Sequence, residues 1–202
     1  MWRACLRICA LAKANGSAFS VAAVILDHKI PCLGFAVKER FHVNIITEGL
    51  KRLGLEPGPW LAAFKQALYD QADPAVQFEI ARPGQKTPGR YTLGQLADQI
   101  AKITPGQKIT YITDVAYSEA NRKKIVEFAR DSDHLFIEAA FMERDRTIAG
   151  VKHHLTARQA GELAAGAGVK QFSIFHFSPR YAEQASLLYQ EATQAFAHCR
   201  QA

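Results

Sequence analysis

The sequence lacks the features that would assign it to a membrane, a zinc finger or a disulfide scaffold. No apolar run approaches the roughly 20 residues that a helix needs to span a bilayer. The cysteines are Cys5, Cys9, Cys32 and Cys199, and their spacing forms neither a CxxC pair nor a disulfide ladder. The chain also has no internal repeat and no low-complexity segment. We therefore interpret the cysteines as reduced thiols and expect a cytoplasmic protein with no membrane partner.

The composition indicates a globular chain with a hydrophobic core. Hydrophobic residues make up 49% of the 202 residues and charged residues 22%, which suits one folded domain. The net charge of +6 favours anionic partners such as nucleic acid, without identifying one. The segment 1–14 has three basic residues and no acidic residue, as in a targeting sequence. It equally fits a chain that begins inside a larger fold, which is the interpretation that we prefer.

Apolar, β-branched runs alternate with helical patterns, and this alternation predicts an α/β fold. Strands are expected at 20–26, 32–37, 108–113, 134–137 and 171–175. Helices are expected from Ser118 to about Arg130, from a capping box at 156–159 to Gly166 or Gly168, and at 181–197. The stretch 41–107 differs, because breakers such as Pro57-Gly58-Pro59 separate short helical pieces at 48–53, 60–69 and 93–103. It predicts an insertion or arm.

Four of the apolar runs stop at a residue that can bind a metal or move a proton. These residues are His28, Asp114, Glu138 and His176. Each alone has an ordinary structural explanation, as a cap or a hydrogen-bonded polar residue. Ligand sites in α/β sheets, however, form beyond the carboxyl ends of the strands. The four positions therefore predict two imidazoles and two carboxylates at one sheet edge, a donor set that suits zinc.

The pair His153-His154 directly precedes the capping box. One interpretation is a surface loop that holds an imidazole near a helix N-terminus. The helix dipole would then disfavour the charged imidazole and lower its pKa. The other interpretation is a proton donor to a leaving group.

Taken together and in this order, the motifs resemble the ribonuclease Z family of tRNA 3′-processing endonucleases. The matching segments are LDHKIPCLGF at 26–35, GLEPGP at 54–59, YITD at 111–114, IEAAF at 137–141, HLTARQA at 154–160 and HFSPRY at 176–181. The resemblance implies a metallo-β-lactamase-like αββα sandwich with a site for two metal ions, usually zinc, with manganese as the alternative.

The resemblance also implies roles for individual residues. His28 resembles a ligand of the first metal, Asp114 the bridging carboxylate, and His176 a ligand of the second metal. His154 resembles the histidine that acts at the scissile phosphate. Glu138 resembles an acidic residue that orients a histidine.

Further residues are implied to bind substrate, a tRNA precursor or other RNA. They are Thr156 and Arg180 near the site, and Lys51, Arg52 and Gly58 in the stretch 41–107, which resembles the family's exosite arm. The resembled enzymes are homodimers in which the arm of one subunit serves the substrate of the other.

Three departures from the family pattern bear on function. The His-x-His-x-Asp-His motif, which supplies several metal ligands and the proposed base, does not occur between Met1 and Asp27. Leu155 stands where the family has a serine, and Ile137 stands where a histidine is common. We therefore predict that 1–202 is a single, partial domain whose first half is missing. A truncated product, a fragmentary gene and one half of a split protein all fit.

The departures keep two other functions open. The same fold could hydrolyse a small ester, although the arm-like segment argues against that. The chain could also be a non-catalytic module that binds RNA through its basic surface. With His28, Asp114 and His176 alone, the isolated chain is expected to hold at most about one zinc ion, weakly, and to show negligible hydrolysis without an upstream half. The non-catalytic module is expected to hold no metal.

Overall fold

The computed structural model describes residues 9–11 and 18–201, which form two compact units. Unit 1 is built from 9–11, 21–38 and 107–201. Unit 2 is built from 18–20 and 39–106, and so takes up the Pro/Gly-broken stretch of the sequence. Among the residues described, no helix is long and apolar enough to cross a membrane.

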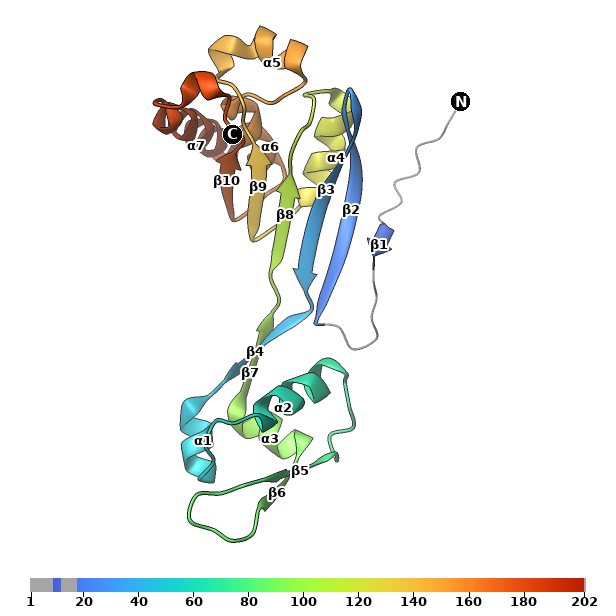
Figure 1. Ribbon diagram of the computed structural model, residues 1–202, viewed down its shortest axis with the longest axis vertical. Helices are drawn as coiled ribbons and strands as arrows, with labels where there is room; N and C mark the ends of the chain where they lie inside the picture. Colours follow the sequence, from blue (N-terminus) through green and yellow to red (C-terminus); the bar gives the residue numbers. More distant parts are fainter. Residues whose placement is uncertain (1–8, 12–17, 202) are drawn as a thin grey trace. The chain divides into compact units, whose positions relative to one another are not determined.

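Unit 1 is organised around a six-stranded sheet in the order β1-β2-β3-β8-β9-β10 (Figure 1). The strands are β1 Cys9–Leu11, β2 Phe19–His28, β3 Ile30–Glu39, β8 Lys108–Ile112, β9 His134–Glu138 and β10 Gln171–Phe175. β3 pairs with β8 antiparallel, whereas β8, β9 and β10 run parallel. The five predicted strands are confirmed, and their parallel order places the ends of β8, β9 and β10 at one edge.

The helices of unit 1 begin where the sequence offers capping side chains. They are α4 Glu119–Ala129, α5 Arg146–Lys152, α6 Ala157–Gly166 and α7 Ala185–Gln201. The hydroxyl of Ser118 accepts the N–H of Asn121 at the start of α4, and the capping box of Thr156 and Gln159 opens α6, as predicted. The prediction that the last helix begins at 181 is wrong, because Pro179–Tyr181 forms a separate 3₁₀ turn.

One face of the sheet is buried under helices. Leu26, Ile112 and Ile137 are at most 1% exposed and belong to the same core as residues of α4, α6 and α7. α6 and α7 approach closely at Gly161, where a Cβ atom would lie 2.2 Å from the carbonyl oxygen of Ala192. Tight packing on this side fixes the positions of the strand ends.

The alternate side chains of the same strands form an exposed apolar face. Phe35 pairs with Tyr111, and Tyr111 with Phe136, so the three form a row across β3, β8 and β9. Each is between 36% and 42% exposed. We call this the outer face; it also carries Ile25, Leu33 and Ile109. A sheet that is apolar on both faces is typical of the middle of a layered fold.

Unit 2 has its own small core. Its elements are β4 Phe41–Ile45, α1 Thr47–Leu53, α2 Trp60–Tyr69, β5 Gln77–Ile80, β6 Gly89–Thr92, α3 Leu93–Ile100 and β7 Ala101–Pro105. β4 pairs with β7 and β5 with β6, around a cluster that includes Phe64 and Leu96. The helix predicted at 93–103 ends at Ile100, because the β-branched stretch after Ala101 pairs with β4. These four strands were not predicted.

Candidate metal centre

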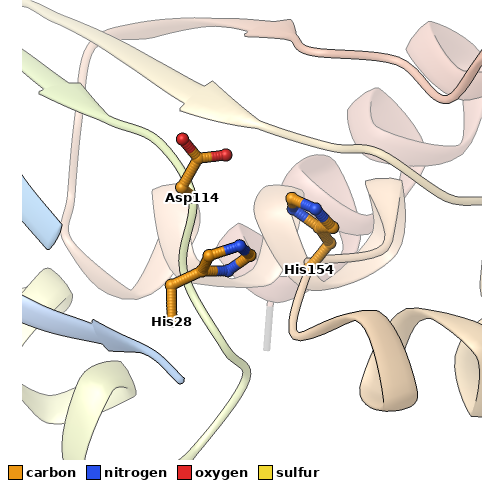
Figure 2. A group of neighbouring side chains, drawn as sticks. All are labelled: His28, Asp114 and His154. Atoms are coloured by element: carbon orange, nitrogen blue, oxygen red, sulfur yellow. The ribbon is translucent and has the colours of Figure 1, made fainter. Parts of the chain in front are cut away.

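The predicted site residues come together at the carboxyl edge of the sheet in unit 1. The ligand atoms of His28, Asp114 and His154 lie within 4.8 Å of one another, and so do those of Glu138, His154 and His176. Figure 2 shows His28 and His154 extending into the same space as the carboxylate of Asp114. His154 belongs to both groups and therefore links them. The structure thus brings together all four strand-end residues and the histidine of the loop before α6.

Hydrogen bonds orient two of the imidazoles. Nδ1 of His28 lies 2.8 Å from the carbonyl oxygen of His153 and must donate to it, because a carbonyl oxygen only accepts. Nδ1 of His154 lies 2.8 Å from Oε2 of Glu138. In both rings Nδ1 is engaged, so Nε2 is the nitrogen that remains for binding a metal or holding a proton. Partners of this kind fix the tautomer and direction of metal-binding histidines.

Glu138 is buried, with 0% of its surface exposed, so it can influence the site only through the residues that it contacts. Its Oε1 accepts the backbone N–H of Val115 at 2.7 Å, and its Oε2 accepts from His154. One carboxylate thereby holds both the segment next to Asp114 and the ring of His154. The orienting role implied by the resemblance matches this geometry.

The environment of His154 favours its charged form. The hydrogen bond to Glu138 raises the pKa of His154, burial opposes this, and the nearby charges of Glu138 and Asp114 add to the rise. The lowered pKa that the helix N-terminus led us to expect is therefore wrong in direction. A carboxylate in hydrogen-bond contact outweighs the dipole of α6.

Replacing Glu138 with glutamine should lower the pKa of His154 in the zinc-free chain. In the folded wild type this pKa lies above its ordinary value of 6.5. The stabilisation from the contact is therefore complete below pH 6.5 and is lost as the pH rises through the folded-state pKa. NMR titration of the His154 ring in both proteins, with a chelator present, measures the difference. Equal pKa values would show that the contact does not control this proton.

The backbone of the site is held in an uncommon conformation. Six described residues other than glycine have positive φ, and four of them lie at the cluster: Lys29, Asp114, His153 and His176, with φ from 48° to 65°. Such conformations cost on the order of 1–3 kcal/mol each and persist where tertiary contacts impose them. The side chains are thus aimed by contacts made elsewhere in unit 1.

The residues predicted to bind substrate occupy different environments. Thr156 is fully buried; its hydroxyl accepts from the N–H of Gln159 and donates to Glu143 at 2.6 Å. The structure therefore gives Thr156 a capping role in place of the predicted substrate contact. Arg180 is exposed, and its Nη1 lies 3.5 Å from Oδ1 of Asp145. In unit 2, Lys51 and Arg52 are exposed and Gly58 is half-buried.

A cavity of about 250 Å³ opens beside His154 and His176. Phe141, Phe177 and Ser178 line it, and so does Lys152, whose exposed side chain adds a positive charge. The sequence did not single out Lys152. A cation beside imidazoles and a carboxylate suits a site for an anionic substrate.

The side chains present fit a zinc or manganese ion. Imidazole nitrogens and a carboxylate are common ligands of both metals. Nδ1 of His176 lies 3.3 Å from Oδ1 of Asp114, so these two side chains converge as well. His28 and His176 belong to separate groups of converging side chains, so they would hold two different ions. Asp114 lies near both of them, and His154 stands beside them, hydrogen-bonded to Glu138.

Comparisons with known proteins agree with this geometry. A family model described as "Beta-lactamase superfamily domain" matches residues 73–177. Ribonuclease Z from Deinococcus radiodurans is 35% identical over 163 residues, which cover 81% of this chain and 45% of the relative. Ribonuclease Z from Crocosphaera subtropica is 33% identical over 187 residues, which cover 88% and 52%. This chain thus spans about half the length of the curated relatives it matches.

A solved structure supports the fold. The metallo-β-lactamase fold protein YhfI from Bacillus subtilis superposes with a TM-score of 0.50 and 13% sequence identity. The match covers 93% of this chain and 46% of that protein.

Proposed function

Because the chain belongs to the β-lactamase superfamily and, within it, to the ribonuclease Z family, we propose that it forms about half of a metal-dependent endoribonuclease that cleaves tRNA precursors. The convergence of His28, Asp114, His154 and His176 on one space carries the proposal. Zinc is the proposed metal, with manganese as the alternative. We also propose that the enzyme acts in the cytoplasm as a homodimer.

The residues of the site divide the chemistry between them. Zinc ions held by His28 and by His176, with Asp114 as the carboxylate that both would share, would polarise the phosphoryl oxygens and lower the pKa of a water molecule. His154 holds a proton at Nε2 and donates it to the departing 3′-oxygen. Its raised pKa favours this role over that of a ligand, since a ligand must lose its proton. Glu138 keeps the ring turned toward the cluster.

Basic side chains support an RNA substrate. Lys152 lines the cavity beside His154, and an ammonium group there attracts a phosphate. Arg180 is exposed, and its guanidinium suits phosphate geometry. In unit 2 we propose that Lys51, Arg52 and the turn at Gly58 contact the body of the tRNA.

The outer face supports the proposal that another polypeptide segment completes the site. Its row of Phe35, Tyr111 and Phe136 is apolar and exposed in this chain. The relatives contain about as much sequence again as the part matched here. We propose that this further part covers the outer face with a second sheet and supplies the remaining metal ligands.

A cleavage assay tests the proposed function. The chain alone, and the chain mixed with the part of the Deinococcus relative that it does not match, are incubated with zinc and either a tRNA precursor or a chromogenic phosphodiester. We expect precursor cleavage only in the mixture, and none when His154→Ala is used. Cleavage of the small ester alone would favour the esterase alternative. Salt-sensitive tRNA binding without hydrolysis in the mixture would favour a non-catalytic RNA-binding module.

A further inference from the structure

The side chain of Asn121 joins two segments of unit 1 that the sheet itself does not join. Asn121 lies in the first turn of α4 and is 1% exposed. Its Oδ1 accepts the N–H of Asp27 at 3.1 Å. Its Nδ2 donates to the carbonyl oxygens of Asp27 at 2.8 Å and Ala116 at 2.9 Å. The amide group thus uses its acceptor and both of its donor hydrogens on backbone atoms.

Both segments carry residues of the candidate metal centre. Asp27 directly precedes His28, and Ala116 follows Asp114 by two positions. The N–H of Ala116 donates to the carbonyl oxygen of Asp27 at 2.9 Å, beside the contacts of Asn121. The side chain of Asn121 therefore contacts the backbone next to two of the proposed metal ligands, His28 and Asp114.

The order of the strands leaves the segments that follow β2 and β8 without a direct connection through the sheet. β3 lies between β2 and β8, so no ladder of backbone hydrogen bonds runs from β2 to β8. Beyond the strand ends, Lys29 and Asp114 have left-handed backbones, which are not favoured locally. The relative position of His28 and Asp114 must therefore be set by contacts beyond the strands, and these include the backbone bond from Ala116 to Asp27 and the three contacts of Asn121.

An amide is the group that fits this position. Aspartate would place an acceptor against the carbonyl oxygens of Asp27 and Ala116. Leucine would remove all three side-chain hydrogen bonds and leave these carbonyl oxygens only their backbone donors, the N–H groups of Ala116 and Ser118. We propose that Asn121 is a positioning residue that sets the spacing between His28 and Asp114 and so tunes metal affinity. The effect on affinity rests on the proposed function, whereas the effect on spacing does not.

The experiment compares Asn121→Ala with Ser118→Ala in the full chain. Ser118→Ala removes the cap of the same helix and lowers stability without removing the contacts to Asp27 and Ala116. Zn²⁺ affinity is measured by competition with a chromophoric chelator, and Co²⁺ absorption reports the ligand geometry. We expect Asn121→Ala to weaken Zn²⁺ binding by about 10- to 100-fold and to alter the Co²⁺ spectrum. Ser118→Ala should change neither.

A second measurement needs no metal. The rings of His28 and His154 have centroids 4.6 Å apart, which is close enough for a nuclear Overhauser effect. We expect this signal to weaken in Asn121→Ala, and in the milder Asn121→Ser, while Ser118→Ala keeps it. If the wild-type chain alone binds no Zn²⁺, the affinities are measured in the mixture used for the cleavage assay, and this signal still decides the positioning role. The proposed function fails if that mixture binds no Zn²⁺ either. An unchanged signal in both Asn121 variants, or equal Zn²⁺ affinity in Asn121→Ala and wild type, would overturn the inference.

Discussion

Glu138→Ala is expected to lower the free energy of unfolding of unit 1 by about 3–5 kcal/mol, because it removes one partner from a buried pair. The carboxylate accepts from the N–H of Val115 and from Nδ1 of His154, and the residue is 0% exposed. Urea unfolding followed by circular dichroism measures the loss, and Glu138→Gln, which keeps the side-chain shape, should lose less.

Glu119→Ala is the matched control for this substitution. Glu119 is 76% exposed and pairs with Lys123 one helical turn away. Exposed pairs of this kind contribute about 0.2–1 kcal/mol. If both alanine variants lost equally little stability, Glu138 would not be the buried support that its contacts indicate.

Phe64→Ala should unfold unit 2 selectively. Phe64 is 0% exposed and lies among the rings of Trp60 and Phe78, at centroid distances of 6.3 and 6.1 Å. Truncating a buried phenylalanine costs about 3–5 kcal/mol, and a unit this small has little stability in reserve. The expected result is loss of the amide signals of unit 2 in NMR spectra.

The two hydrophobic clusters explain why the effect should stay within unit 2. The core of Phe64 shares no residue with the core under the sheet of unit 1. We therefore expect the ring contact between His28 and His154 to persist in Phe64→Ala. Val76→Ala, at a 40% exposed position of the same unit, should leave both units folded. Simultaneous loss of the signals of both units in Phe64→Ala would show that their folding is coupled.

Several elements could be predicted because their signals are local. Ser118 and the pair Thr156 and Gln159 cap helices through side chains three residues apart. The apolar run at 171–175 is a strand in the structure with the same bounds. The helix predicted at 93–103 ends at Ile100, which shows the limit of local signals. The residues after Ile100 form a strand because they pair with β4, which is distant in the sequence.

The sequence by itself determined five of the six strands of the sheet in unit 1, most of the helix starts and the chemical types of the residues at the strand ends. Only the tertiary structure decided that His154 bonds Glu138, that Asn121 links the segments of His28 and Asp114, and that Thr156 is buried. His28 and its partner His153 are 125 residues apart along the chain. Local patterns report on neighbours within a helical turn or a strand. Hydrogen bonds over such separations depend instead on strand order and on how helices pack against the sheet, and these set the direction of each side chain at the site.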